Sequence, residues 1–128
     1  MDFGFLDTLK YDSNGLIPCI TQDVETGKVV MMAYMNKDSL RETIEKGLCA
    51  YWSRSRQEYW IKGMTSGHTQ EVKEILFDCD KDTVLILIKQ NVAACHTGHF
   101  SCFSWRLDGD KIVEFGEKVF DEQNVYKK

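Results

Sequence analysis

The sequence is poor in several features that mark particular classes of protein. It has 1 proline, Pro18, and therefore no proline-rich linker. It also has no run of about 18 apolar residues, so no membrane-spanning helix is expected. With 16 basic and 20 acidic residues and a net charge of -4, it lacks the basic surface of a protein that binds duplex nucleic acid. Any anionic ligand would need a local basic cluster.

The chain also lacks a basic segment at its N-terminus, so no secretory signal is predicted and we expect a cytoplasmic protein. Its 128 residues, of which 43% are hydrophobic and 28% charged, predict one globular domain over residues 1–128. It contains 5 cysteines. In a reducing compartment, such cysteines favour metal binding or catalysis over a disulfide framework.

Hydrophobic patterning predicts a mainly β (α+β) domain with one clear helix, at about 37–46, that begins after Asn36 and stops at Gly47. The run 83–89 is the most apolar and is expected to be the central strand. We expect a compact barrel- or sandwich-like structure of short strands, with a frayed or weakly helical tail at 121–128. The predicted strands are 16–21, 28–35, 49–53, 58–62, 71–77, 83–89, 103–107 and 111–115.

Three aspartates alternate with other residues in the segment DCDKD. On a strand, Asp78, Asp80 and Asp82 would share one face and Cys79 would point to the other. Carboxylates this close repel one another unless a cation joins them, and such hard ligands suit Mg²⁺ or Ca²⁺. An EF-hand does not fit, because its required glycine and final glutamate are both absent. A solvated acidic turn before a buried strand is the alternative interpretation.

Cys79, Cys95 and Cys102 form a candidate site for a softer metal. Their spacing differs from the C-x-x-C pairs of zinc ribbons, but three thiolates from separate positions suit zinc. Three protein ligands would leave a fourth position for water, as in catalytic zinc sites. Cys19 and Cys49 lie in apolar stretches, and we interpret them as small buried hydrophobic residues.

Two of the 3 histidines, His96 and His99, lie between Cys95 and Cys102, and the third is His68. Either of the first two could complete a four-ligand structural zinc site. Alternatively, one histidine acts as a base. Three thiolates leave zinc less Lewis acidic than three histidines, which makes a nearby general base more useful. We take His96 as the first candidate for proton transfer and His68 as the second.

Basic and aromatic side chains are interleaved from Trp52 to Lys62. On a strand period, Trp60 would share a face with Trp52 and with the basic side chains. Arginine forks match phosphate geometry, and tryptophan stacks on flat heterocycles. A solvated strand with cation–π contacts explains the pattern equally well. Next to a metal site, a phosphorylated nucleotide-like ligand is favoured. The candidate substrate-binding residues are Trp52, Arg54, Arg56 and Lys62.

These segments resemble the phosphoribosyl-AMP cyclohydrolase family of histidine biosynthesis. The matching stretches are YWSRSRQEYWIKG (51–63), SGHTQ (66–70), DCDKD (78–82) and ACHTGHFSCFSW (94–105). The resemblance implies an intertwined homodimer that needs zinc and magnesium. It implies hydrolysis of the N1–C6 bond of 1-(5-phosphoribosyl)-AMP to the formimino aminoimidazole carboxamide ribotide. The implied magnesium ligands are Asp78, Asp80 and Asp82, and the implied zinc ligands are Cys95, Cys102 and, from the partner chain, Cys79.

Two details qualify the resemblance. The family is often fused to a pyrophosphohydrolase, and nothing follows residue 128 here, so we expect the single-function form. Met64 stands where an acidic residue is expected after Lys62 and Gly63. Two other functions stay open from the residues themselves. One is a zinc hydrolase for another nucleotide, and the other is a non-catalytic, zinc-stapled nucleotide-binding module.

Overall fold

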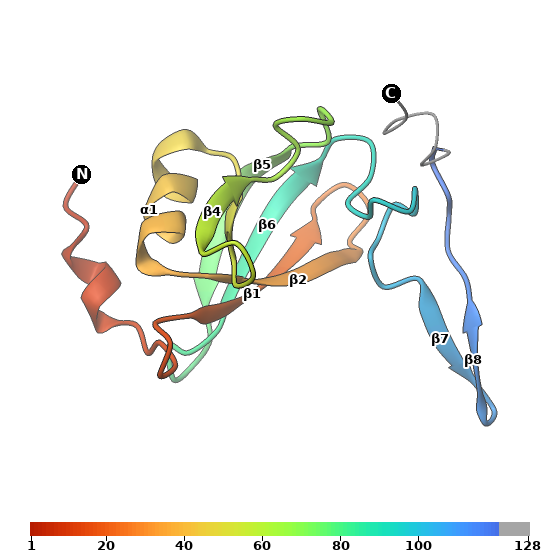
Figure 1. Ribbon diagram of the computed structural model, residues 1–128, viewed down its shortest axis with the longest axis horizontal. Coiled ribbons are helices and arrows are strands. Elements are labelled where there is room, and N and C mark those ends of the chain that lie inside the picture. Colours follow the sequence, from red (N-terminus) through yellow and green to blue (C-terminus); the bar gives the residue numbers. More distant parts are fainter. Residues whose placement is uncertain (121–128) are drawn as a thin grey trace.

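The computed structural model describes residues 1–120, so the prediction for the tail at 121–128 falls outside the described residues. Eight strands and one α-helix confirm the mainly β prediction, and Figure 1 shows their arrangement. No helix among these residues has the length and apolar character needed to cross a membrane. The elements are η1 (Gly4–Thr8), β1 (Ile17–Asp23), β2 (Val29–Met35), α1 (Lys37–Lys46), β3 (Ala50–Ser53), β4 (Glu58–Ile61), β5 (Gln70–Phe77), β6 (Val84–Gln90), β7 (Trp105–Asp108) and β8 (Lys111–Glu114).

The main sheet has 4 strands in the order β2-β1-β6-β5. β6 lies inside the sheet, parallel to β1 and antiparallel to β5, which confirms the prediction that the most apolar run is central. Alternate residues of β6, such as Val84, Ile86 and Ile88, are buried, as expected for a strand with one face on the core. The predicted roles of Cys19 and Cys49 are also confirmed, since both are fully buried. Burial raises the pKa of Cys49 to about 12, so this thiol stays protonated.

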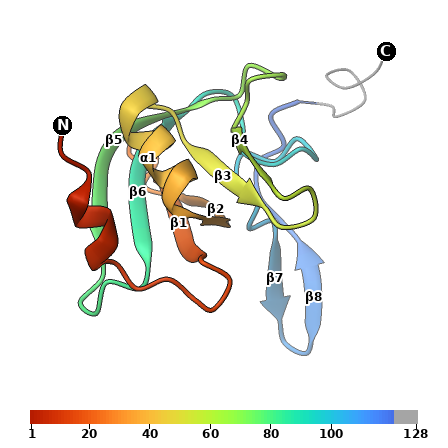
Figure 2. The same ribbon diagram turned by 60° about the vertical axis from the view of Figure 1, so that its left-hand side comes forward.

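Helix α1 begins and ends where the sequence predicts. Asn36 and Ser39 form a reciprocal capping box, in which the Asn36 side chain accepts from the Ser39 N–H at 2.8 Å. Gly47 closes the helix with a φ of 72°, a left-handed conformation that favours glycine. Leu40 and Thr43 are buried on the inner side, where Thr43 also accepts from the Ala50 N–H at the start of β3. Figure 2 shows α1 next to β3.

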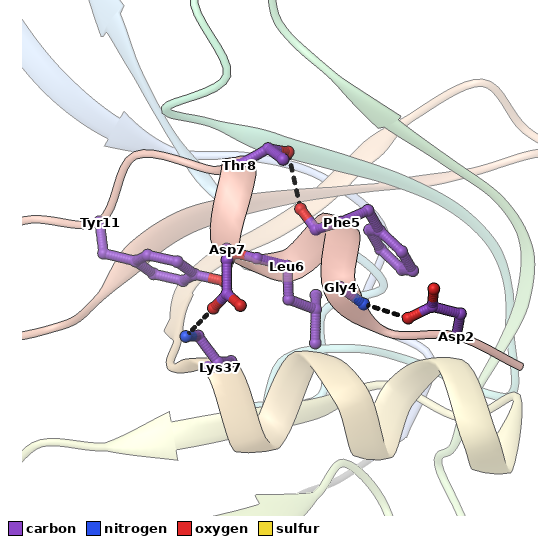
Figure 3. Close-up of polar contacts among 8 residues, drawn as sticks. All are labelled: Asp2, Gly4, Phe5, Leu6, Asp7, Thr8, Tyr11 and Lys37. Atoms are coloured by element: carbon purple, nitrogen blue, oxygen red, sulfur yellow. Dashed lines mark hydrogen bonds and ion pairs between the residues drawn. The ribbon is translucent and has the colours of Figure 1, made fainter.

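The 3-10 helix η1, which the sequence pattern did not predict, lies against the first turn of α1 (Figure 3). Asp7 forms an ion pair with Lys37, and Tyr11 donates to the Leu6 carbonyl at 2.9 Å. Leu6 is buried in the core. Beyond η1, the Lys10 N–H donates to the Lys81 carbonyl at 2.8 Å. The N-terminal segment therefore supports the turn that follows β5.

The remaining strands form two separate hairpins, β3–β4 and β7–β8. The described sheets do not close into a barrel, so the barrel form of the prediction is wrong. The reason is that β2 and β5 are the two edge strands of the main sheet and are not hydrogen-bonded to each other. The β7–β8 hairpin projects away from the rest of the chain in both views (Figures 1 and 2). We call residues 103–115 the arm.

Candidate active site

The acidic segment is a turn between β5 and β6 and not a strand, so the alternating faces that we predicted for it are wrong. Asp78 builds the turn, because its Oδ1 accepts from the N–H groups of Asp82 and Thr83 at 3.0 and 3.2 Å. Lys81 takes a left-handed φ of 61° within it. The turn nevertheless brings the three carboxylates together. One oxygen from each of Asp78, Asp80 and Asp82 lies within 4.8 Å of the others.

The carboxylates of this triad perturb one another. The neighbouring carboxylates Asp78 and Asp80 raise the pKa of Asp82. For Asp78, desolvation acts to raise the pKa, but hydrogen bonds from the turn outweigh it and the pKa is lowered. Oxygens that share one Mg²⁺ lie up to about 4.2 Å apart, twice the usual metal–oxygen distance. The observed 4.8 Å limit is therefore close to what one hard cation needs.

Cys95 and Cys102 lie together in the segment between β6 and the arm. The Cys102 N–H donates to the Val30 carbonyl at 2.6 Å, which fastens this segment to β2. Partial burial of the thiol and the adjacent Cys95 raise the pKa of Cys102 to about 11, against the opposing effect of Lys62. A metal ion would displace the proton from this thiol. The structure therefore brings together two of the three cysteines that the sequence predicts as soft ligands.

Cys79 does not reach this pair within one chain. It is exposed on the β5–β6 turn, where β6 begins, whereas Cys95 and Cys102 follow the end of β6. Figures 1 and 2 both show these two places at opposite ends of the strand. The 7 residues of β6 span about 20 Å at the usual rise per residue. Among residues 1–120, the Asp triad is accordingly the only group of three or more His, Cys, Asp or Glu side chains close enough to share a metal.

The histidines have three different environments. His68 is buried, and burial together with the nearby Lys62 lowers its pKa, so the ring is neutral at neutral pH. His96 is exposed and makes no hydrogen bond or ion pair to the described part of the chain. His99 is buried with both nitrogens occupied, Nδ1 at 3.0 Å from the Thr97 hydroxyl and Nε2 at 3.5 Å from Glu114.

A tight turn fixes the position of His68. Gly63 has a φ of 83°, and a Cβ there would lie 2.3 Å from the His68 carbonyl carbon. Only glycine tolerates this conformation and this contact. Met64 in the same turn is exposed, with its side chain away from the core. Its departure from the expected acidic residue therefore changes the surface and leaves the packing of His68 intact.

The basic and aromatic segment is also interrupted by a turn. Arg54 and Arg56 lie at the tip of the β3–β4 hairpin, where the expected alternation stops. Trp60 pairs directly with Tyr51, so it faces away from Trp52, and our prediction that the two tryptophans share a face is wrong. The Arg54 guanidinium lies 4.6 Å from the centre of the Tyr34 ring. Arg56 is exposed and lies 3.8 Å from Glu58.

The structure thus divides the predicted substrate residues between two places. Trp52 and Arg54 line a polar pocket of about 330 Å³ between the hairpin tip and the start of β1. Lys62 lies at the other end of the hairpin, near His68 and Cys102, whose pKa values it lowers. The complete lining of the pocket is Asn14, Leu16, Asn36, Trp52, Arg54 and Gln57.

Sequence reasoning missed two features of this region. It gave Lys62 a role in phosphate binding alone, whereas the structure places its charge beside the Cys102 thiol. It also overlooked Thr97, whose hydroxyl lies 2.9 Å from Cys95 Sγ. The tight Cys-x-Thr-x-His spacing was the available signal, because residues two apart in a turn can converge on one point.

Comparison with known proteins places the sequence of this chain in a family. The model of the phosphoribosyl-AMP cyclohydrolase family matches residues 31–104. The phosphoribosyl-AMP cyclohydrolase of Desulfatibacillum aliphaticivorans is 57% identical over 117 residues, which cover 91% of this chain and 94% of that protein. The enzyme of the same name from Pelotomaculum thermopropionicum is 52% identical over 124 residues, with 96% of each chain covered.

A longer relative contains the same domain. The histidine biosynthesis bifunctional protein HisIE of Thermoanaerobacter pseudethanolicus is 53% identical over 122 residues, which cover 95% of this chain and 56% of that protein. The family match includes the acidic turn and both cysteines of the segment after β6. The chain therefore belongs to the phosphoribosyl-AMP cyclohydrolase family, a family of hydrolases that act on a carbon–nitrogen bond.

Proposed function

We propose that this chain is a zinc- and magnesium-dependent hydrolase that opens the adenine ring of 1-(5-phosphoribosyl)-AMP at the N1–C6 bond, a step of histidine biosynthesis in the cytoplasm. The observation that carries the proposal is the convergence of three aspartate oxygens within 4.8 Å on the same turn as Cys79, in a member of this family. The chemistry of the two donor sets fits one hard and one soft cation.

The zinc site is shared between two copies of the chain. Cys95 and Cys102 of one copy would hold zinc together with the partner's Cys79, because β6, about 20 Å long, runs between these groups within one chain. The partner's acidic turn must then approach with its cysteine. Each site would thus combine zinc ligands from both chains with the magnesium ligands of one chain, which explains why the single chain has no complete centre.

The arm offers a surface for the second copy. Leu107 and Ile112 lie directly opposite each other on it, 72% and 70% exposed. Trp105 on the same face is 61% exposed. Apolar side chains that gather on a projecting hairpin mark an interaction site, and the arm continues directly from the segment that holds Cys102. The intertwined homodimer of the proposal would bury this face.

The double substitution Leu107→Glu with Ile112→Glu is expected to convert the dimer to a monomer and to remove zinc binding and turnover with it. If the variant dimerised, the two introduced carboxylates of each arm would lose their water in the interface, which is unfavourable. Sedimentation, zinc analysis and the activity assay measure the three effects. Lys111→Glu, on the opposite face of the arm, is the matched control and should remain dimeric. A double variant that stays dimeric and active would contradict the role of the arm.

Bound zinc would supply Lewis acidity for the attack of water on C6. The histidines of this chain would move the proton. His96, exposed and adjacent to Cys95, is the first candidate to accept it. His68 is the second, because its lowered pKa keeps the ring neutral and able to accept a proton.

His96→Ala is expected to keep zinc but to lose about 10²- to 10⁴-fold in kcat, the usual contribution of a general base. Zinc analysis and steady-state kinetics test this directly. Near-normal turnover with zinc retained would exclude His96 as the base and transfer the assignment to His68. His68→Ala should then show the loss, accompanied by loss of the acidic limb of the pH profile.

Basic side chains lie at both ends of the β3–β4 hairpin, which suits a substrate with a phosphate at each end. Lys62 would neutralise charge near the zinc ligands, while Arg54 and Arg56 at the hairpin tip would hold a phosphate. Trp52 would stack on a flat ring of the ligand. These groups make a small phosphorylated nucleotide the expected partner, and neither nucleic acid nor a membrane enters the proposal.

The alternative is a non-catalytic, zinc-stapled nucleotide-binding module. A four-ligand structural site would need a histidine with a free nitrogen, which leaves His96, because the two nitrogens of His99 are already engaged by Thr97 and Glu114. Zinc removal would unfold such a module, whereas a catalytic site loses activity first. Absorbance assays with phosphoribosyl-AMP and with AMP test the function itself. Ring opening of the former alone supports the proposal, and turnover of neither contradicts it.

A further inference from the structure

The Thr97 hydroxyl contacts the Cys95 sulfur, and the buried His99 contacts the same hydroxyl. Thr97 Oγ1 is 2.9 Å from Cys95 Sγ and 3.0 Å from His99 Nδ1. His99 is 4% exposed, and its Nε2 is 3.5 Å from Glu114 at the end of β8. The four side chains form a continuous polar chain from a proposed zinc ligand to the base of the arm.

The backbone holds this arrangement in place. The Cys95 N–H donates to the His99 carbonyl at 3.3 Å, and the Gly98 N–H donates to the Cys95 carbonyl at 3.0 Å. Gly98 has a φ of 101°, and a Cβ there would lie 2.1 Å from the Phe120 carbonyl oxygen. Only glycine fits at this point. The turn therefore presents the Thr97 hydroxyl to the Cys95 sulfur.

The chemistry of the groups fixes the direction of the hydrogen bonds. A metal-bound thiolate can only accept, and a hydroxyl has one proton to give. Thr97 must therefore donate to the Cys95 sulfur, and its oxygen must accept from His99 Nδ1–H. Hydrogen bonds from outside a metal site orient its ligands and tune the charge they donate. Such tuning is most useful where three thiolates together donate strongly.

We propose that Thr97, held by His99, is a positioning residue that orients the Cys95 sulfur and draws charge away from it. The inference rests on the proposed zinc site and deepens it. In this proposal, the Thr97 hydroxyl and the buried His99 act on a metal ligand and do not merely fill space in the core. Glu114 lies 3.5 Å from the other nitrogen of His99, and an ion pair forms there only when the imidazole carries both protons.

Two pairs of proteins isolate the hydroxyl group. Thr97→Val replaces it by a methyl group of similar size, and Thr97→Ala differs from Thr97→Ser by the hydroxyl alone. Zinc affinity of the full-length protein is measured by competition with a chromophoric chelator. The Val and Ala variants should bind zinc about 10- to 100-fold more weakly than wild type, whereas Ser should stay close to wild type.

Cobalt provides a signature that a merely structural residue would not change. Loss of the hydrogen bond raises the energy of the sulfur lone pair, so the thiolate-to-cobalt charge-transfer band should move to longer wavelength in the Val and Ala variants. Thermal unfolding of the metal-free proteins shows whether each one folds. If Val does not fold, the comparison of Ala with Ser decides.

Each outcome has one meaning. Unchanged zinc affinity and band position in the folded Val or Ala variant would overturn the inference, and so would equal losses in Ala and Ser, which would assign the effect to the methyl group. A wild-type protein that binds neither zinc nor cobalt would instead contradict the proposed zinc site.

Discussion

A heterodimer made of one Cys79→Ser chain and one Cys102→Ser chain is expected to turn over substrate, although each variant alone is inactive. If Cys79 serves the partner's site, the heterodimer has one site with both substitutions and one site with neither. Its activity should then be about half that of the wild-type dimer, as the two-fold symmetry of a shared site requires. Co-expression with two different affinity tags yields the heterodimer free of both parents.

The matched control for this experiment is the heterodimer of Cys95→Ser with Cys102→Ser. These two cysteines lie side by side in one chain, so both sites of that heterodimer are damaged and no activity should return. An inactive first heterodimer, with both chains folded and dimeric, would contradict the sharing of zinc between copies. Activity in both heterodimers would contradict the assignment of Cys95 and Cys102 to the same site.

Asp80→Asn is expected to lower kcat/KM by about 100-fold or more and to abolish the response to Mg²⁺, because a metal that offsets transition-state charge contributes several kcal/mol. Asp80 is the best choice within the triad. Asp78 also accepts the backbone hydrogen bonds that build the turn, so its replacement would disturb the position of Cys79 as well. Zinc content should not change, since the thiols are untouched.

Kinetics at increasing Mg²⁺ concentration, together with metal analysis, measure this effect. Asp110→Asn is the matched control, because Asp110 is an exposed aspartate in a different hairpin turn, at the tip of the arm. It should behave as wild type. An Asp80→Asn enzyme that responds to Mg²⁺ as wild type does would remove the acidic turn from the proposed mechanism.

The elements of the fold were largely predictable, because local patterns determine them. The alternating burial of β6 and the Asn36 and Gly47 caps of α1 are encoded in short stretches of sequence. Their assembly was not predictable in the same way. Whether the sheet closes depends on contacts between distant strands, and η1 is held in place by contacts with α1, such as the Asp7–Lys37 ion pair.

The site residues show the same division. The residue types correctly predicted a carboxylate cluster, but the strand alternation that we used to explain it does not exist there. Asp78 makes the segment a turn, and the carboxylates converge for that reason. The strand argument failed again for Trp52 and Trp60, because a turn separates them and reverses the chain. Period-two reasoning holds only as far as the strand itself extends.

The spatial relations between the motifs could not be read from the sequence. The proximity of Lys62 to Cys102, and the chain from Cys95 through Thr97 to His99, depend on how the loops fold over the end of the main sheet. The separation of Cys79 from Cys95 is likewise a property of the fold, since β6 runs between them. Family resemblance predicted a zinc site shared between two chains, and the position of β6 between these cysteines supports that proposal.

Stepwise metal return to the stripped dimer tests the central claim most directly. The protein is freed of metal with a chelator, checked for folding, and assayed for ring opening of phosphoribosyl-AMP as zinc is added in the presence of Mg²⁺. The account predicts no turnover at the start and a linear rise that ends at one zinc per chain, with no activity if Mg²⁺ is withheld. Full turnover by the metal-free protein, or no turnover by the zinc- and magnesium-loaded dimer, would contradict it.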